Sequence, residues 1–264
     1  MIFAKRSYIL VVSNRANFKT FETDCGENGV PMKPKEKAAL AVELLKKEYP
    51  EAICSLNEKE PFRLLVAVRL SAQCTDKRVN EVTPALFERF PTVEAMASAK
   101  TEDVEELIRS CGFYHAKARD IISCAQVLLN EYGGKIPDTV EVLTTLPGVG
   151  RKTANLLVGD LYGGHAVVCD THFIRIMRRL GFTDTTDPLK TEKTMRPLLP
   201  ANESGDFCHR CVLHGRAVCR ARGAKCSECV LKNICEEFKN TAGTPSDGVV
   251  PKKPKNITPK GRKH

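Results

Sequence analysis

The sequence has no hydrophobic run long enough to cross a membrane as a helix. A spanning helix needs about 20 consecutive apolar residues, and the apolar run near the start, residues 8–12, is far shorter. No small-residue cleavage site accompanies this run, so the pattern does not predict a secretory signal. The 12 cysteines are therefore not expected to form disulfides, because thiols stay reduced inside most cells.

Alternation of polar and apolar residues, the pattern of half-buried strands, is also almost absent. The apolar segment 166–169 is too short to build a sheet, and no repeat of about 20 to 50 residues is present. Helical periodicity begins at Pro34 and recurs at 35–48, 61–73, from 101, at 115–132, 138–146 and 170–181. The sequence therefore predicts an all-α fold.

The net charge of +9 is unevenly distributed along the chain. Residues 241–264 carry a net charge of +5, so the other 240 residues carry only +4. This excess is compatible with a polyanionic partner but does not identify one. The composition of 241–264, rich in Thr, Gly, Pro, Ser and Lys, predicts a disordered basic tail. Residues 1–33 show no sustained period and are interpreted as a loose N-terminal extension.

The stretch "LPGVGRKTANLLVGD", residues 146–160, reads as two helices joined by a tight turn. Gly148 and Gly150 permit the positive φ angles and the close backbone approach that such a turn needs. The N–H groups that begin the following helix are a natural seat for a phosphate. A helix-hairpin-helix of this kind holds a nucleic-acid backbone, but a hairpin that serves packing alone remains an alternative. From this segment alone, Lys152 is either a phosphate contact or a nucleophile.

Asp170 follows the hairpin lysine by eighteen residues, in "AVVCDTHFIRI". It comes directly after an apolar run and before an amphipathic helix, where Asp is a favoured N-cap for the N–H of His172 or Phe173. A carboxylate in that position could also act as a base or an electrostatic partner for Lys152. Because a carboxylate raises the pKa of a nearby amine, a reactive lysine would then need desolvation or a cationic neighbour.

Six of the cysteines lie close together, between Cys208 and Cys235. Four of them follow an x6-x2-x5 spacing, and four thiolates suit either a tetrahedral zinc ion or a cubane iron–sulfur cluster. These four are Cys219, Cys226, Cys229 and Cys235. They contain only one closely spaced pair, whereas zinc sites usually have two, so the spacing favours an iron–sulfur cluster. Arg220, Arg222 and Lys225 make their loop basic, a composition suited to phosphate contacts. The remaining two, Cys208 and Cys211, are interpreted as packing residues.

Taken together and in this order, these features resemble the endonuclease III family of base-excision DNA repair glycosylases. The segments that carry the resemblance are "LPGVGRKTAN", "CDTHFIRI", the x6-x2-x5 cysteine loop, "LLVAVRLSAQCTD" (64–76) and "GFYHAKA" (112–118). It covers about residues 34–240. The resemblance implies two helical domains flanking a DNA-binding cleft: a six-helix barrel with the hairpin over 54–164, and an iron–sulfur domain built from 34–53 with 165–240.

The resemblance also implies roles for single residues. Lys152 is the expected nucleophile and Asp170 its catalytic partner. Gln73 is expected to fill the gap left by an extruded base, and Phe113 to be the apolar wedge. Further DNA contacts are expected from Gly148, Gly150, Arg151, Arg220, Arg222 and Lys225. The four spaced cysteines are the expected ligands of a [4Fe-4S] cluster.

The expected activity is that of a bifunctional DNA glycosylase and AP lyase, which removes oxidised pyrimidines through a lysine Schiff base and nicks 3′ to the abasic site by β-elimination. One alternative is a monofunctional glycosylase that uses water, as adenine glycosylases do; Lys152 and the short tail after Asn240 argue against it. Another is a non-enzymatic, metal-stapled DNA-binding module.

The expected partner is double-stranded DNA with damaged bases or abasic sites, bound by a monomer with no membrane association. In a bacterium, this implies a cytoplasmic protein associated with the nucleoid. The basic, acid-poor start of the chain also fits an organellar transit peptide, which is the alternative to a loose extension.

Overall fold

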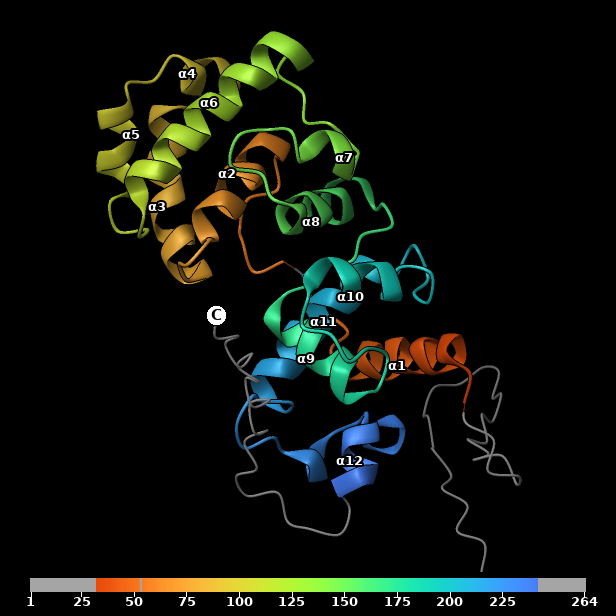
Figure 1. Cartoon of the computed structure of the whole chain (residues 1–264). Coiled ribbons are helices and arrows are strands. Elements are labelled where there is room, and N and C mark those ends of the chain that lie inside the picture. Colours follow the sequence, from red (N-terminus) through yellow and green to blue (C-terminus); the bar gives the residue numbers. More distant parts are fainter. Residues whose placement is uncertain (1–31, 53, 242–264) are drawn as a thin grey trace, which may run out of the picture. The chain divides into compact units, whose positions relative to one another are not determined.

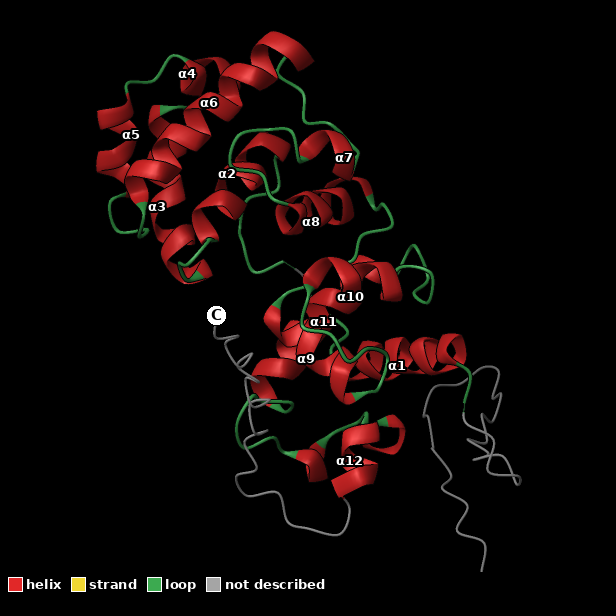
Figure 2. Cartoon of the chain, in the orientation of Figure 1, coloured by secondary structure: helices red, strands yellow, loops and turns green. Residues whose placement is uncertain are grey.

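The computed structural model describes residues 32–52 and 54–241, and every regular element in this part of the chain is helical (Figures 1 and 2). Described residues from Pro34 onward belong to one compact unit. The predicted all-α class is therefore confirmed. None of the described helices is long and apolar enough to cross a membrane. The predicted N-terminal extension and basic tail fall almost entirely outside the described residues.

Twelve α-helices and two short 3-10 turns follow one another in the described ranges. They are α1 (Pro34–Glu48), α2 (Pro61–Ser71), α3 (Asp76–Arg89), α4 (Val93–Ala97), α5 (Thr101–Ile108), α6 (Tyr114–Tyr132), α7 (Val140–Leu143), α8 (Arg151–Tyr162), α9 (Thr171–Arg179), α10 (Pro188–Met195), α11 (Ser204–Ala217), η1 (Cys226–Glu228), η2 (Lys232–Ile234) and α12 (Glu236–Thr241).

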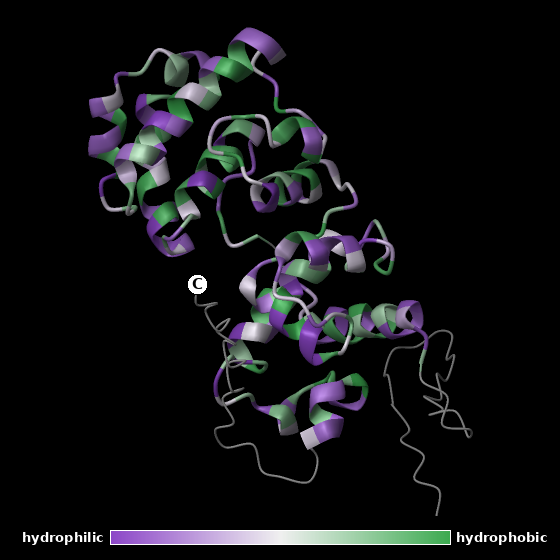
Figure 3. Ribbon diagram, viewed as in Figure 1, coloured by the Kyte–Doolittle hydropathy of each residue, from purple (hydrophilic) through white to green (hydrophobic). Residues whose placement is uncertain are grey.

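A first hydrophobic core is shared by α2 to α8. The apolar helix α2 lies within it and packs against α3, α6 and α8, as its apolar character all round predicts. Around it, α4 and α5 pack on α6, and α7 packs on α8. Figure 3 shows hydrophobic and hydrophilic residues interspersed along these helices, the pattern of elements that bury one side. The core thus holds the hairpin helix α8 against α2.

A second hydrophobic core gathers α1 with α9, α10 and α11, although α1 is far from them in sequence. Phe173 on α9 and Phe207 on α11 meet edge to face, with ring centroids 6.1 Å apart. Cys208 and Cys211 are buried in this core, 2% and 0% exposed, in agreement with their interpretation as packing residues. Leu231 and Ile234 attach the cysteine-rich segment to the same core.

Helices α8 and α11 pack directly on each other and link the two cores. A Cβ added to Gly159 on α8 would lie 3.7 Å from the Cα of Gly205 on α11, so the two backbones approach closely. Near this crossing, the His209 ring nitrogen Nε2 lies 2.8 Å from an oxygen of Asp160. Lys152 at the start of α8 and Asp170 before α9 are therefore carried by helices that both pack on α11.

Several helix boundaries differ from the sequence expectations for local reasons. Helix α2 ends at Ser71 rather than at Gln73, because Gln73 adopts a left-handed backbone conformation with φ +53°. Helix α9 ends at Arg179, two residues before Gly181, the expected stop, which has φ +80°. Sequence periodicity missed α3, α4, α10 and α12 and assigned no helix to the region of α11. Their apolar positions are few or interrupted: α3 contains Pro84, and α4 has only five residues.

Candidate active site

The hairpin turn between α7 and α8 packs closely against the ion pair of Arg69 and Asp120. Gly148 has φ +72°, and a Cβ there would lie 2.7 Å from the Cβ of Asp120 and 2.8 Å from Nε of Arg69. These two side chains are joined by a two-nitrogen contact, with Arg69 Nε donating to Asp120 Oδ2 at 3.0 Å. Only glycine satisfies both the backbone angle and the space at this position.

Gly150 differs from what the sequence predicted. Its φ is −85°, an angle open to any residue, and a Cβ there would meet nothing within 4 Å. The expected positive φ is therefore wrong for Gly150. It is the N-cap of α8 and supplies no side-chain cap to the first N–H groups of that helix. The open space above it is what a bound backbone phosphate would occupy.

Lys152 lies in the first turn of α8 and is exposed to solvent. Among the described residues its amine has no hydrogen bond or ion pair. It lines a pocket of about 240 Å³ together with Cys169, which directly precedes Asp170, and with the first residues of α10. The lysine therefore faces open space next to the segment that leads to Asp170.

Asp170 is the N-cap of α9, the simpler of the two roles that its position suggested. Its Oδ1 accepts the Phe173 N–H at 2.7 Å, and the side chain is half-buried. No hydrogen bond or ion pair joins it to Lys152. Its second oxygen, Oδ2, accepts no hydrogen bond from the described residues. Capping therefore leaves part of the carboxylate free for a ligand.

A buried carboxylate, Glu192, ties the start of α8 to the segment before Asp170. Arg151 grips it with both sides of its guanidinium, Nε to Oε2 at 2.7 Å and Nη2 to Oε1 at 2.9 Å. Arg196 donates to the same Oε1 and also to Asn155 Oδ1, each at 2.9 Å. Asn155 Oδ1 in turn accepts the N–H of Val167 at 3.2 Å.

This network determines the charge state of Glu192, and it occupies the guanidinium of Arg151. Burial alone would raise the pKa of Glu192, but the hydrogen bonds from Arg151 and Arg196 outweigh it and the pKa is lowered. The carboxylate is therefore ionised at neutral pH. The Arg151 guanidinium, expected as a DNA contact, is here bound to Glu192. Its role toward DNA stays a prediction.

Two exposed loops carry the residues that are expected to enter the DNA, Gln73 and Phe113. Gln73 and Phe113 both have left-handed backbone angles, φ +53° and +54°, and are the only described non-glycine residues that do. Phe113 is 68% exposed, unusual for a large apolar side chain. The two loops adjoin, since a Cβ on Gly112 would lie 3.7 Å from the carbonyl oxygen of Gln73. The structure brings the two predicted residues to neighbouring positions.

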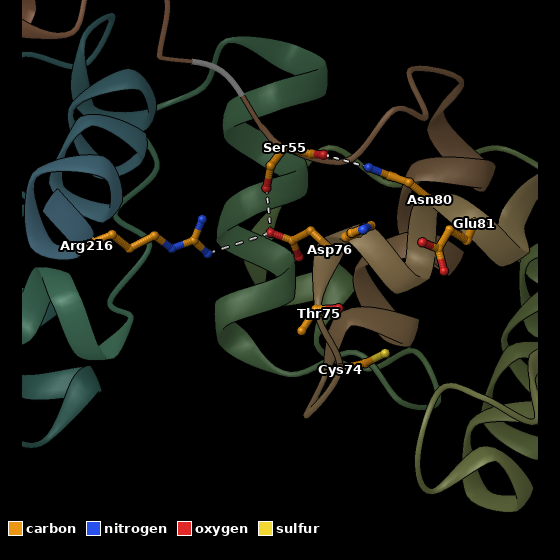
Figure 4. Close-up of a pocket in the computed structure, with 8 residues that line it drawn as sticks. Ser55, Cys74, Thr75, Asp76, Asn80, Glu81 and Arg216 are labelled. Carbon is orange, nitrogen blue, oxygen red and sulfur yellow. Dashed lines mark hydrogen bonds and ion pairs between the residues drawn. The ribbon is translucent and has the colours of Figure 1, made fainter.

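A larger pocket, of about 800 Å³, opens beside the Gln73 loop and was not anticipated from the sequence (Figure 4). Asp76, at the start of α3, accepts a hydrogen bond from the hydroxyl of Ser55 at 2.5 Å. From the last turn of α11, Arg216 reaches to 3.8 Å from the same carboxylate. Donors and acceptors from both cores thus line one opening. The only sequence signal was "TD" at the end of the "LLVAVRLSAQCTD" segment.

The four expected cluster ligands lie together in the segment after α11. Burial and then the neighbouring thiols of Cys219, Cys235 and Cys226 raise the pKa of Cys229 to about 11. Arg179 Nη1 donates to Cys219 Sγ at 3.3 Å. Each of the four is partly exposed, unlike Cys208 and Cys211. The cysteine set is thus gathered in one place and already receives a hydrogen bond at a sulfur.

The geometry of this set bears on the kind of metal it suits. A tetrahedral zinc site with bonds of about 2.3 Å brings its sulfurs to about 3.8 Å from one another. No group of three or more His, Cys, Asp or Glu residues in the described ranges is arranged to hold a single metal ion. Four cysteine thiolates are also the donor set of a multi-iron group, whose ligands bind separate iron atoms.

The basic loop between Cys219 and Cys226 presents its charges outward. Arg220, Arg222 and Lys225 are all exposed. Lys225 pairs with Glu228 at 3.1 Å, whereas Arg222 has no ion pair among the described residues. The loop is therefore accessible to an anionic ligand, with Arg222 the least engaged of its three cations.

The comparisons with known proteins agree with this arrangement. The model of the HhH-GPD superfamily base excision DNA repair proteins matches residues 66–201. Endonuclease III of Synechocystis sp. is 46% identical over 202 residues, 76% of this chain and 92% of that protein. A non-covalent endonuclease III–DNA complex is similar at a TM-score of 0.73 and 39% identity, covering 81% of this chain and all of that one. A trapped endonuclease III–DNA covalent intermediate has the same TM-score at 40% identity, covering 80% and 100%.

A helical fold with a helix-hairpin-helix turn, matched over more than half of the chain, defines the class of protein. The chain belongs to the HhH-GPD superfamily of base excision DNA repair proteins and, within it, to the endonuclease III family. The family resemblance drawn from the sequence is thereby confirmed. Endonuclease III relatives also support an iron–sulfur cluster in this family, consistent with the cysteines near the C-terminus.

Alanine substitution of the two hairpin glycines should have opposite effects: one should mainly lower stability and the other should mainly weaken DNA binding. Gly148→Ala should lower the free energy of unfolding by about 3 kcal/mol, because it combines a left-handed angle with overpacking. Gly150→Ala should change it by about 1 kcal/mol or less, yet weaken binding to duplex DNA by about tenfold, or ~1.4 kcal/mol. Chemical denaturation and fluorescence anisotropy measure the two effects. Full DNA affinity in Gly150→Ala would contradict a phosphate above that residue.

Proposed function

We propose that this chain is a bifunctional DNA glycosylase and AP lyase of base-excision repair, acting on oxidised pyrimidines and abasic sites. One observation carries the proposal: Lys152 stands unpaired within the described residues, at the start of the hairpin helix, in a pocket that it shares with Cys169 beside Asp170. An amine used only for phosphate binding would need no such pocket. Membership of the endonuclease III family supports the same activity.

The reaction begins with extrusion of the damaged nucleotide, because C1′ of its sugar cannot be approached inside the duplex. The neutral amine of Lys152 attacks C1′ as the glycosidic bond breaks, and the electron pair of that bond leaves with the base. Asp170 stabilises positive charge on the sugar or assists the proton transfer through its uncapped oxygen. The ammonium formed on Lys152 loses its proton as the ring opens to the Schiff base.

Strand cleavage follows from the electron demand of that Schiff base. The positively charged imine acidifies the hydrogens on C2′, and a base removes one of them. The electrons of the C–H bond form a C2′–C3′ double bond while the C3′–O bond breaks, releasing the 3′ phosphate as leaving group. Hydrolysis of the imine then regenerates Lys152. A lysine nucleophile thus accounts for both activities, which a water nucleophile would not.

DNA is held mainly through its backbone. The first N–H groups of α8 beside Gly150 and the exposed cations of the cysteine loop, above all Arg222, provide phosphate contacts independent of sequence. Gln73 and Phe113, on adjoining loops, enter the space of the extruded nucleotide. The pocket with Asp76 and Arg216 offers a carboxylate and a guanidinium to the edge of the extruded base.

We also propose a [4Fe-4S] cluster held by Cys219, Cys226, Cys229 and Cys235. When bound, it supplies a covalent cross-link among the loop segments rather than a step of the reaction. The chain's own residues then do the binding: Arg220, Arg222 and Lys225 project from the loop that the ligands close. With this arrangement the two cores correspond to two domains, 54–164 and 34–53 with 165–240, in a monomer that, if the source is a bacterium, works on DNA in the cytoplasm.

Covalent trapping separates the lyase from its alternatives. On abasic-site DNA with borohydride, the native protein should give an adduct that Lys152→Ala does not, because reduction of the imine fixes the lysine to the sugar. Retained DNA binding of Lys152→Ala, measured by anisotropy, is the control. A native protein that binds but gives no adduct would indicate a monofunctional glycosylase or a non-enzymatic module.

Two substitutions of Asp170 separate helix capping from catalysis. Asparagine is an equally good N-cap, so Asp170→Asn should keep the unfolding free energy while lowering the glycosylase rate by about 100-fold. Asp170→Ala should lose the same activity and also about 1 kcal/mol of stability. Single-turnover kinetics and denaturation supply the two readouts. An Asp170→Asn protein with native rates would leave the residue with its capping role alone.

Anaerobic purification tests the cofactor. The protein should be coloured, with broad visible absorption and acid-labile sulfide, and Cys229→Ser should reduce both. Cys208→Ser is the matched control, because that thiol is buried in the second core and outside the ligand set. A colourless protein with stoichiometric zinc would rule out the cluster.

A further inference from the structure

Gln73 and Phe113 have strained, left-handed backbone conformations, and contacts with the rest of the protein must maintain them. A left-handed backbone costs a non-glycine residue about 1 to 3 kcal/mol and persists only where its surroundings impose it. Both residues are solvent-exposed, so packing of their own side chains does not supply the constraint. The constraint has to come from the backbone on either side of them.

Lys117, on α6, lies directly behind both loops. It is 1% exposed, the most thoroughly buried lysine among the described residues. Its ammonium donates to the carbonyl oxygen of Leu70 at 2.8 Å and to that of Cys111 at 2.7 Å. Leu70 is three residues before Gln73, and Cys111 is two residues before Phe113. One buried group therefore binds the backbone of both loops.

The surroundings of this ammonium are unusual for a buried charge. No carboxylate pairs with it among the described residues, and burial lowers the pKa of Lys117. The loss of water around the ammonium is compensated by hydrogen bonds to two carbonyl oxygens. One of them, that of Leu70, lies in the last turn of α2, where the helix dipole favours a cation. The thiols of Cys74 and Cys111 are also near it, and the nearby guanidinium of Arg69, a like charge, lowers the pKa of Lys117 as well. Burying a cation with so few compensating contacts costs folding free energy.

We propose that Lys117 is a positioning residue that locks the Gln73 and Phe113 loops into one arrangement, so that the gap-filling residue and the wedge act on the DNA together. This inference rests on the proposed function, in which these two side chains replace the extruded nucleotide. Lys117 itself touches neither substrate nor reacting atoms. Its contribution is to the extrusion step and not to the chemistry at Lys152.

This assignment predicts a difference between substrates. Lys117→Met removes the ammonium and leaves two buried carbonyls without a donor, which frees the loops from each other. Glycosylase activity on an oxidised pyrimidine should fall by at least about tenfold. Borohydride trapping on abasic-site DNA should fall by less than about threefold, because no base has to be extruded. Lys117→Arg, which keeps a buried cation, should recover part of the glycosylase rate.

A control and a double-mutant cycle separate positioning from general loss of stability. Gln126, also on α6, donates to the carbonyl of Ala97 at 3.0 Å, away from these loops. Gln126→Met should therefore lower both activities equally or not at all. In a Phe113→Ala background, Lys117→Met should cost much less than in the native chain, because the wedge that it positions is already gone.

The outcomes are distinguishable from failure of the proposed function. Equal losses on the two substrates, or additive effects with Phe113→Ala, would overturn the positioning role while trapping by the native protein still succeeds. Failure of the native protein to form any adduct would overturn the proposed function instead. If Lys117→Met does not fold, Lys117→Gln, which keeps an N–H donor, provides the same comparison between substrates.

Discussion

The rest of the site depends on the hydrogen bonds that the buried carboxylate of Glu192 accepts from Arg151 and Arg196. This carboxylate holds Arg151 and Asn155 of α8 directly, and through Asn155 and Arg196 it reaches the backbone just before Asp170. A direct hydrogen bond from the Val167 N–H to Asn155 Oδ1 adds a second polar link between the hairpin helix and the segment before α9. The charged hydrogen bonds of Glu192 depend on direction, so they fix the backbone that carries Lys152 relative to the segment that leads to Asp170. The residues that define the site are thus arranged by one that takes no part in the reaction.

A common principle recurs elsewhere in the structure, since each exposed loop of functional interest lies over a buried or half-buried charge. The Arg69–Asp120 pair lies beneath the hairpin turn, and Lys117 lies behind the Gln73 and Phe113 loops. Exposed loops bury too few apolar atoms to be rigid by packing. Lys117 binds backbone carbonyls at fixed points, and the Arg69–Asp120 pair lies in close contact with Gly148; both leave the outer surface free for a ligand.

The sequence predicted the helical class, the longer helices and the identity of the residues now found around the site, because these follow from periodicity and from short motifs. It placed Gln73 and Phe113 in the site but gave no sign that both adopt left-handed angles, which only the buried Lys117 explains. It suggested Arg151 as a DNA contact and gave no sign of its partner Glu192, which lies 41 residues away in a helix that periodicity missed. The pocket around Asp76 and Arg216 was equally invisible, since it joins residues far apart in the chain. Long-range pairing of charges is the information that local patterns lack.

Gly150 has a further consequence for how the protein would move on DNA. The position is open on its outer side and needs no special backbone angle, so no side chain stands between the amides of α8 and a bound strand. A contact made by amides to a phosphate is the same at every nucleotide, and its energy does not change when the protein shifts by one step. Such a surface gives a smooth energy profile along the duplex. The absence of one methyl group thus favours one-dimensional search, in which the rare lesion is found by sliding rather than by repeated encounters from solution.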